Sequence, residues 1–238
     1  MNGRAVNGCG ARDSPPRAGP PSISAWQNGV MTDARPAPFI PDKARAKAYL
    51  FWVAVITLVF MAVYPTINWY TDTRAHRYQL YLPFELDIPL VPAFIWAYVS
   101  MYALFLMPLF MVSASRMNAL GKQLVAGTVL CGIVFLVLPA DLGFMREVPE
   151  DALYASTFSA LFGVDRPHNL MPSLHVVFSC LILFMCREGH HLILRVLLFV
   201  WVVLIVASTV LVHQHHLIDA LTGLLVTLIL RRYIRPAA

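Results

Sequence analysis

Six apolar segments constrain this chain more than any other feature of its sequence. They cover approximately residues 48–68, 88–112, 119–139, 172–186, 192–213 and 217–231. A helix needs about 20 apolar residues to cross the hydrocarbon core of a bilayer. The segments therefore predict an all-α fold, a polytopic membrane protein built as a bundle of six transmembrane helices. The fourth and sixth segments are short for a span, so we expect their polar ends to lie at membrane depth inside the bundle.

The composition agrees with a membrane protein rather than a soluble one. Hydrophobic residues make up 58% of the chain and charged residues only 13%, whereas a soluble domain has about 25% charged residues. The four cysteines show no CxxC spacing, which argues against a disulfide framework or a cysteine zinc site. The net charge of +5 is explained by membrane topology, and we expect no nucleic-acid partner.

The N-terminal 41 residues differ from the rest of the chain. They hold seven of the 17 prolines together with scattered arginines and glycines, a composition typical of disorder. We therefore predict a disordered, Pro/Arg-rich tail over residues 1–41, followed by a six-helix membrane domain over residues 42–238. A further hypothesis places the natural start of the chain at Met31, because the sequence from there leads directly into the first apolar segment.

The basic residues predict the orientation of the bundle. With six spans, 14 of the 18 lysines and arginines fall on the side that holds both termini. The other side receives only Arg74, Arg77, Arg146 and Arg166. The positive-inside rule makes the termini cytoplasmic, in what we expect to be a bacterial inner membrane. The loops at 69–87 and 140–171 and the turn at 214–216 then face the periplasm or a lumen.

Polar residues from three distant segments converge on this outer face. His175 begins the fourth segment, and His215 and Asp219 lie where the fifth gives way to the sixth. The four-residue spacing lets the carboxylate face the imidazole across one helical turn, fixing its tautomer and leaving the other nitrogen free as a nucleophile or base. Pro172 and Ser173 fit a helix N-terminus, which can bind a phosphate through its free N–H groups. This set predicts phosphoryl transfer through a phosphohistidine.

Two other interpretations of the histidines remain open from the residues alone. His213, His215 and His216 could form a zinc site with Asp219 and His175, although no further ligand spacing is clear. Membrane histidines and an aspartate could also serve a transporter or proton relay, but these polar residues lie near one face instead of along a path through the bilayer. We expect an enzyme that needs no metal and no cofactor.

Two stretches resemble a known family. "MPSLHVVFS" and "STVLVHQHHLIDALTG" are similar to the second and third motifs of the type 2 phosphatidic acid phosphatase superfamily, whose members have a six-helix core and an extracytoplasmic active site. The resemblance implies that His215 is the nucleophile and that Asp219 orients it. It implies that His175 protonates the leaving oxygen and later activates water or an alcohol. Ser173 and the helix start would hold phosphate oxygens.

The first and third motifs depart from the pattern of that superfamily. Its first motif usually has a lysine and, seven residues later, an arginine-proline pair. Here the candidate is Arg146, which is followed by Glu147 and has Pro139 seven residues before it. The third motif usually begins with serine-arginine, where this chain has Thr209 after the serine. We expect Arg146 to be the main phosphate-binding cation, with Arg166 as the second candidate.

"PSLH" and the threonine of the third motif resemble the branch that includes inositol-phosphorylceramide synthases. Members of that branch move a phosphorylated head group from one lipid to another alcohol. The resemblance thus favours a phospholipid or lipid phosphate as substrate and head-group transfer to an alcohol acceptor. The alternative is hydrolysis of phosphatidic acid, phosphatidylglycerol phosphate or a polyprenyl diphosphate, with release of inorganic phosphate.

Overall fold

The structure is a computed structural model that describes residues 39–236. The proposed start at Met31 and nearly all of the expected tail lie outside these residues. Within them the elements are helices, and strand-like pairing is limited to one isolated bridge. Three helices are long and apolar enough to cross a membrane, namely α2 (Lys43–Asp72), α6 (Ala114–Val137) and α9 (Leu192–Leu211). They correspond to the first, third and fifth predicted segments.

The second predicted segment is a series of short helices rather than one span. It contains η2 (Pro92–Phe94), α3 (Ile95–Val99), α4 (Met101–Leu104) and α5 (Met107–Met111). Pro92 and Pro108 lie in the first turns of η2 and α5, where a missing N–H group is tolerated and the preceding helix ends. The count of six regular spans is therefore not established, since the other apolar segments are shorter or broken.

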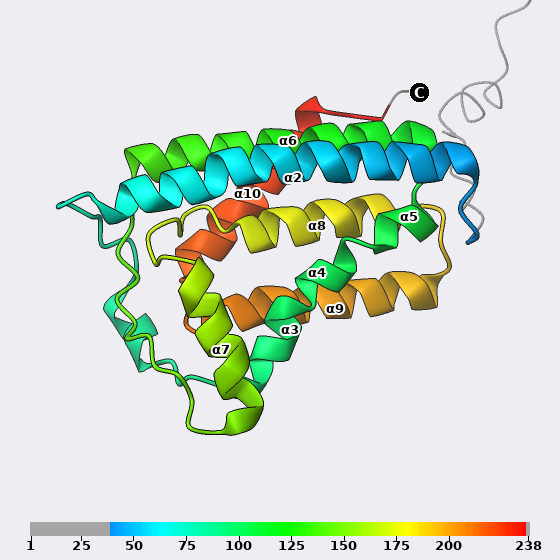
Figure 1. Ribbon diagram of the computed structural model, residues 1–238. Coiled ribbons are helices and arrows are strands. Elements are labelled where there is room, and N and C mark those ends of the chain that lie inside the picture. The colour runs from blue at the N-terminus through cyan, green and yellow to red at the C-terminus, as the bar shows by residue number, and fades with distance from the viewer. Residues whose placement is uncertain (1–38, 237–238) are drawn as a thin grey trace, which may run out of the picture. The chain divides into compact units, whose positions relative to one another are not determined.

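Helix α8 (Leu174–Cys186) forms the centre of the described bundle. Eleven of its 13 residues are buried, and it packs against α6, α9 and α10 (Leu217–Tyr233) (Figure 1). A helix enclosed by other helices does not need the length of a lipid-facing span. This accounts for the short fourth segment. The sequence did not predict two further elements, η1 (Pro83–Asp87) and α7 (Ala152–Val164), which lie in the outer loops.

Small residues bring the helices close together at two places. A Cβ atom on Gly121 would lie 1.9 Å from the Trp52 ring, so α6 approaches α2 directly there. A Cβ atom on Gly223 of α10 would lie 2.8 Å from the backbone oxygen of Ser173, at the start of α8. Small residues at such contacts are typical of membrane helix packing. The contact at Gly223 fixes the spacing between the motif that contains Ser173 and the motif that ends at Gly223.

We expect the Gly223→Ala variant to disturb both stability and activity. The added methyl group meets backbone, which cannot rotate away, so overpacking should cost about 1–3 kcal/mol. The start of α8 would also shift relative to α10, and a misplacement of this kind typically lowers activity by about 10–100-fold. The measurements are thermal melting in detergent and turnover. Gly163→Ala is the matched control, because nothing lies within 4 Å of its added Cβ atom, and it should leave both readings near wild type.

Candidate active site

The His215–Asp219 pair lies at the start of α10. His216 is the N-cap residue, and its backbone N–H donates to Oδ2 of Asp219 (2.8 Å). Nδ1 of His215 lies 3.3 Å from the same oxygen, and Asp219 is only 1% exposed. Because a carboxylate only accepts, the proton of His215 belongs on Nδ1. Nε2 then keeps its lone pair, which is the form a nucleophile requires.

The second motif meets this pair through a backbone hydrogen bond. Ser173 is the N-cap residue of α8, as the sequence predicts, and its N–H donates to the Asp219 carbonyl (3.0 Å). Two residues further along, in the first turn of α8, the ring of His175 lies 6.1 Å from the ring of His215, between centroids. Tyr98 of α3 stacks on the His175 ring, with the centroids 4.1 Å apart, and fixes its orientation. The structure thus brings both proposed catalytic histidines together.

Two buried polar atoms in this cluster lack hydrogen-bond partners among the described residues. They are Oγ of Ser173 and Nε2 of His175. Buried polar groups in folded proteins are normally hydrogen-bonded, and an exception calls for an explanation. Both atoms belong to the motif for which the sequence predicts phosphate contacts, so a bound phosphate oxygen would satisfy them.

Arg146 reaches this cluster from the loop between α6 and α7. Its Nη2 donates to Oε1 of Gln214 (3.4 Å), the residue directly before His215, and its Nη1 donates to the carbonyl of Asp165. The guanidinium also lies over the Phe162 ring, 5.0 Å from its centroid. Burial lowers the pKa of Arg146, and the charge of Asp165 opposes that change. The side chain is therefore held in place beside the histidines, with 15% of it exposed.

Asp165 is a site residue that sequence reasoning missed. Its carboxylate lies 3.7 Å from Nη2 of Arg146 and accepts a hydrogen bond from the hydroxyl of Tyr64 (2.8 Å). Burial raises the pKa of Asp165, while Tyr64, Arg146 and the charge of His215 lower it. Asp165 ends α7, a helix that was not predicted, so no sequence pattern marks it. It places a second carboxylate beside the proposed phosphate position.

Arg166, the second candidate clamp, has a different partner. Its Nε lies 3.1 Å from Oδ2 of Asp72, at the end of α2, and 47% of the side chain is exposed. The amide of Asn68 binds the backbone of Arg166 on both sides, donating to its carbonyl (2.8 Å) and accepting from its N–H (2.9 Å). The structure therefore places Arg166 where α2 holds the loop that leads to Ser173, whereas Arg146 contacts the neighbour of His215.

The comparison with protein families agrees with this geometry. A family model described as the PAP2 superfamily matches residues 73–232, about two thirds of the chain. The chain belongs to the PAP2 superfamily. Membership indicates a membrane-associated enzyme of phosphatase or phosphotransferase type with a phosphorylated, lipid-type substrate. No significant match to the chain is found among curated proteins or among solved structures, and the branch resembling inositol-phosphorylceramide synthases stays a prediction.

The PAP2 match begins after α2, although α2 contributes to the site. Tyr64 binds Asp165, and Asn68 and Asp72 hold Arg166. Tyr64 and Asn68 lie on the predicted first span, where an apolar pattern masks their individual roles, and Asp72 lies in the loop predicted to follow it. The part of the chain outside the family match therefore supports the loop that carries Asp165 and leads to the second motif.

Thr209 shows how this PAP2 chain accommodates the missing third-motif arginine. The Thr209 carbonyl accepts hydrogen bonds from the N–H groups of Gln214 (3.0 Å) and His215 (2.9 Å). Its hydroxyl donates to the Val206 carbonyl (2.7 Å), and the residue is fully buried. Thr209 thus shapes the turn before His215 through its backbone. Arg146, from a different loop, supplies the guanidinium beside that turn.

The remaining histidines of the third motif have structural partners. His213 bonds the Ile88 carbonyl (2.9 Å), and His216 bonds the Leu142 carbonyl and lies 3.3 Å from Oε2 of Glu85. Glu85, which the sequence places in water or against a head group, is instead 1% exposed and accepts from the N–H of Leu217 (2.7 Å). Within residues 39–236, no group of three or more potential ligands is arranged to hold a metal ion.

Proposed function

We propose that this PAP2 superfamily chain cleaves a lipid phosphodiester through a phosphohistidine on His215 and transfers the head-group phosphate to an alcohol. The observation that carries the proposal is the His215–Asp219 pair beside two buried atoms that lack protein partners, Oγ of Ser173 and Nε2 of His175. The first atom can donate to a phosphate oxygen, and the second lies on a ring next to His215. The proposed location is the extracytoplasmic end of the bundle, which the count of basic residues supports.

The proposed reaction has two displacements at phosphorus. In the first, the lone pair on Nε2 of His215 attacks phosphorus, the bond to the lipid oxygen breaks, and His175 gives a proton to that oxygen. In the second, the acceptor hydroxyl attacks the phosphohistidine, the P–N bond breaks and its electron pair returns to His215. His175 takes the proton of the hydroxyl and is ready for another cycle. Asp219 keeps Nδ1 protonated and stabilises the charge on the ring throughout.

The charge of the site favours a diester over a monoester. A phosphate monoester has a second pKa near 6, so it carries close to two negative charges at neutral pH, whereas a diester carries one. Arg146 is the guanidinium that contacts the residue next to His215, and two carboxylates, Asp165 and Asp219, lie beside the same position. The α2 lysine nearest to the site, Lys47, is 17 residues before Tyr64, about 25 Å away along the helix. It therefore adds no positive charge at the phosphate position. One cation and two carboxylates suit a singly charged phosphate better than a doubly charged one.

Burial of the histidines favours an alcohol over water as the acceptor. The His215 side chain is 8% exposed and Nε2 of His175 is buried, so bulk water has little access to the phosphohistidine. The Asp165 carboxylate, 21% exposed, is positioned to accept a hydrogen bond from an acceptor hydroxyl. Hydrolysis is the competing outcome. With a diester, water attacking the same intermediate releases the head-group phosphate monoester, whereas a lipid phosphate monoester releases inorganic phosphate.

The test is trapping of the covalent intermediate. Purified protein is mixed with phospholipids and lipid phosphates labelled at phosphorus, with and without added alcohols, and then denatured. We expect protein-bound label from a diester that is stable to base and labile to acid, and a new diester when an alcohol is present. Label released only as head-group phosphate from a diester, or as inorganic phosphate from a lipid phosphate, would assign hydrolysis instead. Absence of both turnover and bound label across the panel would overturn the proposal.

The Asp165→Asn variant tests the charge argument separately. Neutralising this carboxylate removes repulsion of a second phosphate charge while keeping an amide that Tyr64 can still bond. We expect the ratio of kcat/KM for a monoester to kcat/KM for a diester with the same lipid chains to rise about tenfold, equivalent to about 1.4 kcal/mol. Asp151→Asn, at the exposed N-cap of α7, is the matched control and should leave the ratio unchanged. An unchanged ratio in Asp165→Asn would contradict the argument.

A further inference from the structure

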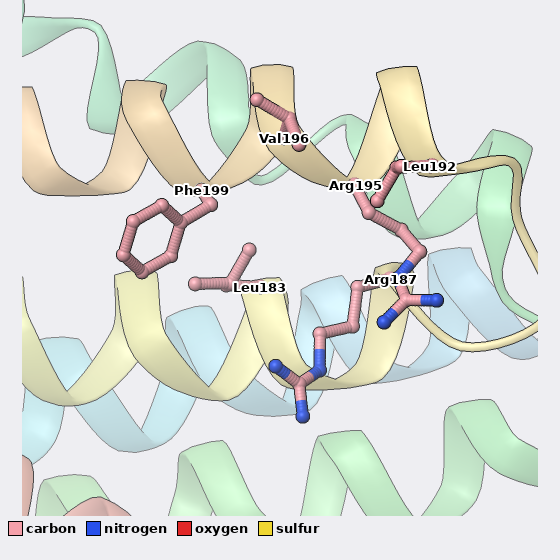
Figure 2. A pocket seen from close by; sticks show the side chains of 6 residues that line it. All are labelled: Leu183, Arg187, Leu192, Arg195, Val196 and Phe199. Carbon is pink, nitrogen blue, oxygen red and sulfur yellow. The ribbon is translucent and has the colours of Figure 1, made fainter.

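A groove lies between α8 and α9 at the end away from His175 and His215. It has a volume of about 160 Å³. Six residues line it: Leu183, Arg187, Leu192, Arg195, Val196 and Phe199 (Figure 2). Arg187 is 12 residues beyond His175 along α8, about 18 Å at 1.5 Å per residue. The groove is therefore separate from the candidate active site.

Two guanidinium groups lie at one end of this groove. Arg187 is the C-cap residue of α8 and Arg195 lies in the first turn of α9, and both side chains extend to the same end of the gap (Figure 2). The nearby carboxylate, Glu188, pairs with Arg116 (2.6 Å) and Arg231 (3.8 Å) instead. Within residues 39–236, neither Arg187 nor Arg195 forms an ion pair. Paired guanidiniums of this kind suit a phosphate.

The rest of the groove is apolar and open to its surroundings. Leu183 and Phe199 form its walls beyond the arginines (Figure 2), and Phe199 is 56% exposed. The neighbouring α9 residues Val196 and Leu192 are 49% and 69% exposed. Free phosphate would use only the charged end. A phospholipid matches both parts, since its phosphate meets the arginines and its acyl chain covers the apolar walls.

We propose that this groove binds an anionic phospholipid of the leaflet that contains the chain termini. By the count of basic residues that leaflet is cytoplasmic, and anionic lipids there are attracted to basic pockets between helices. The bound lipid holds the start of α9 against the end of α8. The proposal is independent of the reaction at His215 and would stand if that reaction were different.

The test is native mass spectrometry of the full chain in detergent with added lipid. The protein carries His215→Ala, so that added lipid is not consumed. Dioleoyl phosphatidylglycerol is compared with dioleoyl phosphatidylcholine, which has the same chains and no net charge. We expect one phosphatidylglycerol molecule to bind at least tenfold more tightly than phosphatidylcholine. The Arg187→Gln/Arg195→Gln double variant should lose that molecule.

The controls separate the groove from general charge attraction. Arg232→Gln removes an exposed arginine at the end of α10 that does not line the groove, and it should bind lipid as the parent does. If the double variant does not fold, Arg195→Gln alone should weaken binding at least threefold. Equal binding by parent and arginine variants, equal affinity for the two lipids, or displacement by inorganic phosphate as effective as by phosphatidylglycerol would each overturn the proposal.

Discussion

The His215→Ala variant is expected to lose about 10⁴-fold or more of its turnover together with all of the acid-labile phosphate on the protein. The reason is that Nε2 of His215 forms the covalent bond to phosphorus, and alanine offers no nucleophile in its place. The fold should survive, because the His215 side chain has one hydrogen-bond partner, Asp219, and the turn is held by the backbone N–H of His215. The measurements are turnover of a labelled phospholipid and protein-bound label.

His213→Asn is the control from the same run of histidines. His213 stacks on Phe144 and has a positive φ of 55°, and asparagine is one of the few residues that tolerate this conformation. We expect this variant to keep turnover within about tenfold of wild type, and to form the phosphoenzyme normally. If His213→Asn lost the bound label while His215→Ala retained it, the nucleophile would be wrongly assigned.

The parts of the site that could be predicted are those defined by short-range geometry. The four-residue spacing of His215 and Asp219 predicts that they lie within reach of each other, as they do at the start of α10. Ser173 lies at the N-cap of α8, a position that serine favours, although its side chain makes no capping hydrogen bond there. The long helices α2, α6 and α9 follow from uninterrupted apolar runs, which leave the backbone no other way to satisfy its hydrogen bonds in a bilayer.

The parts that could not be predicted depend on contacts between distant segments. Nothing around Asp165 or Glu85 in the sequence separates a carboxylate bound to a distant residue from one in water, since the difference comes from Tyr64 in one case and from His216 in the other. The broken helices at 92–111 have the same composition as a continuous span, and only the positions of the prolines hint at the breaks. The choice of Arg146 over Arg166 is already the expectation from the sequence, but the partners that distinguish them, Gln214 and Asp72, depend on the loop conformations.

The choice of Arg146 as the main phosphate-binding cation leads to the second large expected effect, in the Arg146→Gln variant. We expect kcat/KM to fall by about 10²–10³-fold, the usual loss when one donor that stabilises developing phosphate charge is removed from a buried site. Arg146→Lys keeps the charge but not the planar fork that contacts Gln214 and Asp165, so it should recover only part of the loss. The measurement is kcat and KM for one phosphodiester lipid across the three proteins.

Arg166→Gln is the matched comparison, because it removes an arginine from a neighbouring loop whose partner is Asp72. Its side chain is half exposed and its backbone stays clamped by Asn68, so we expect kcat/KM to fall by less than about tenfold. The opposite ranking, with Arg166→Gln the more damaging, would move the phosphate position toward the end of α2. The rise in the monoester-to-diester ratio of kcat/KM would then no longer be expected for Asp165→Asn. Asp165 acts on substrate charge only if the phosphate lies between Arg146 and His215.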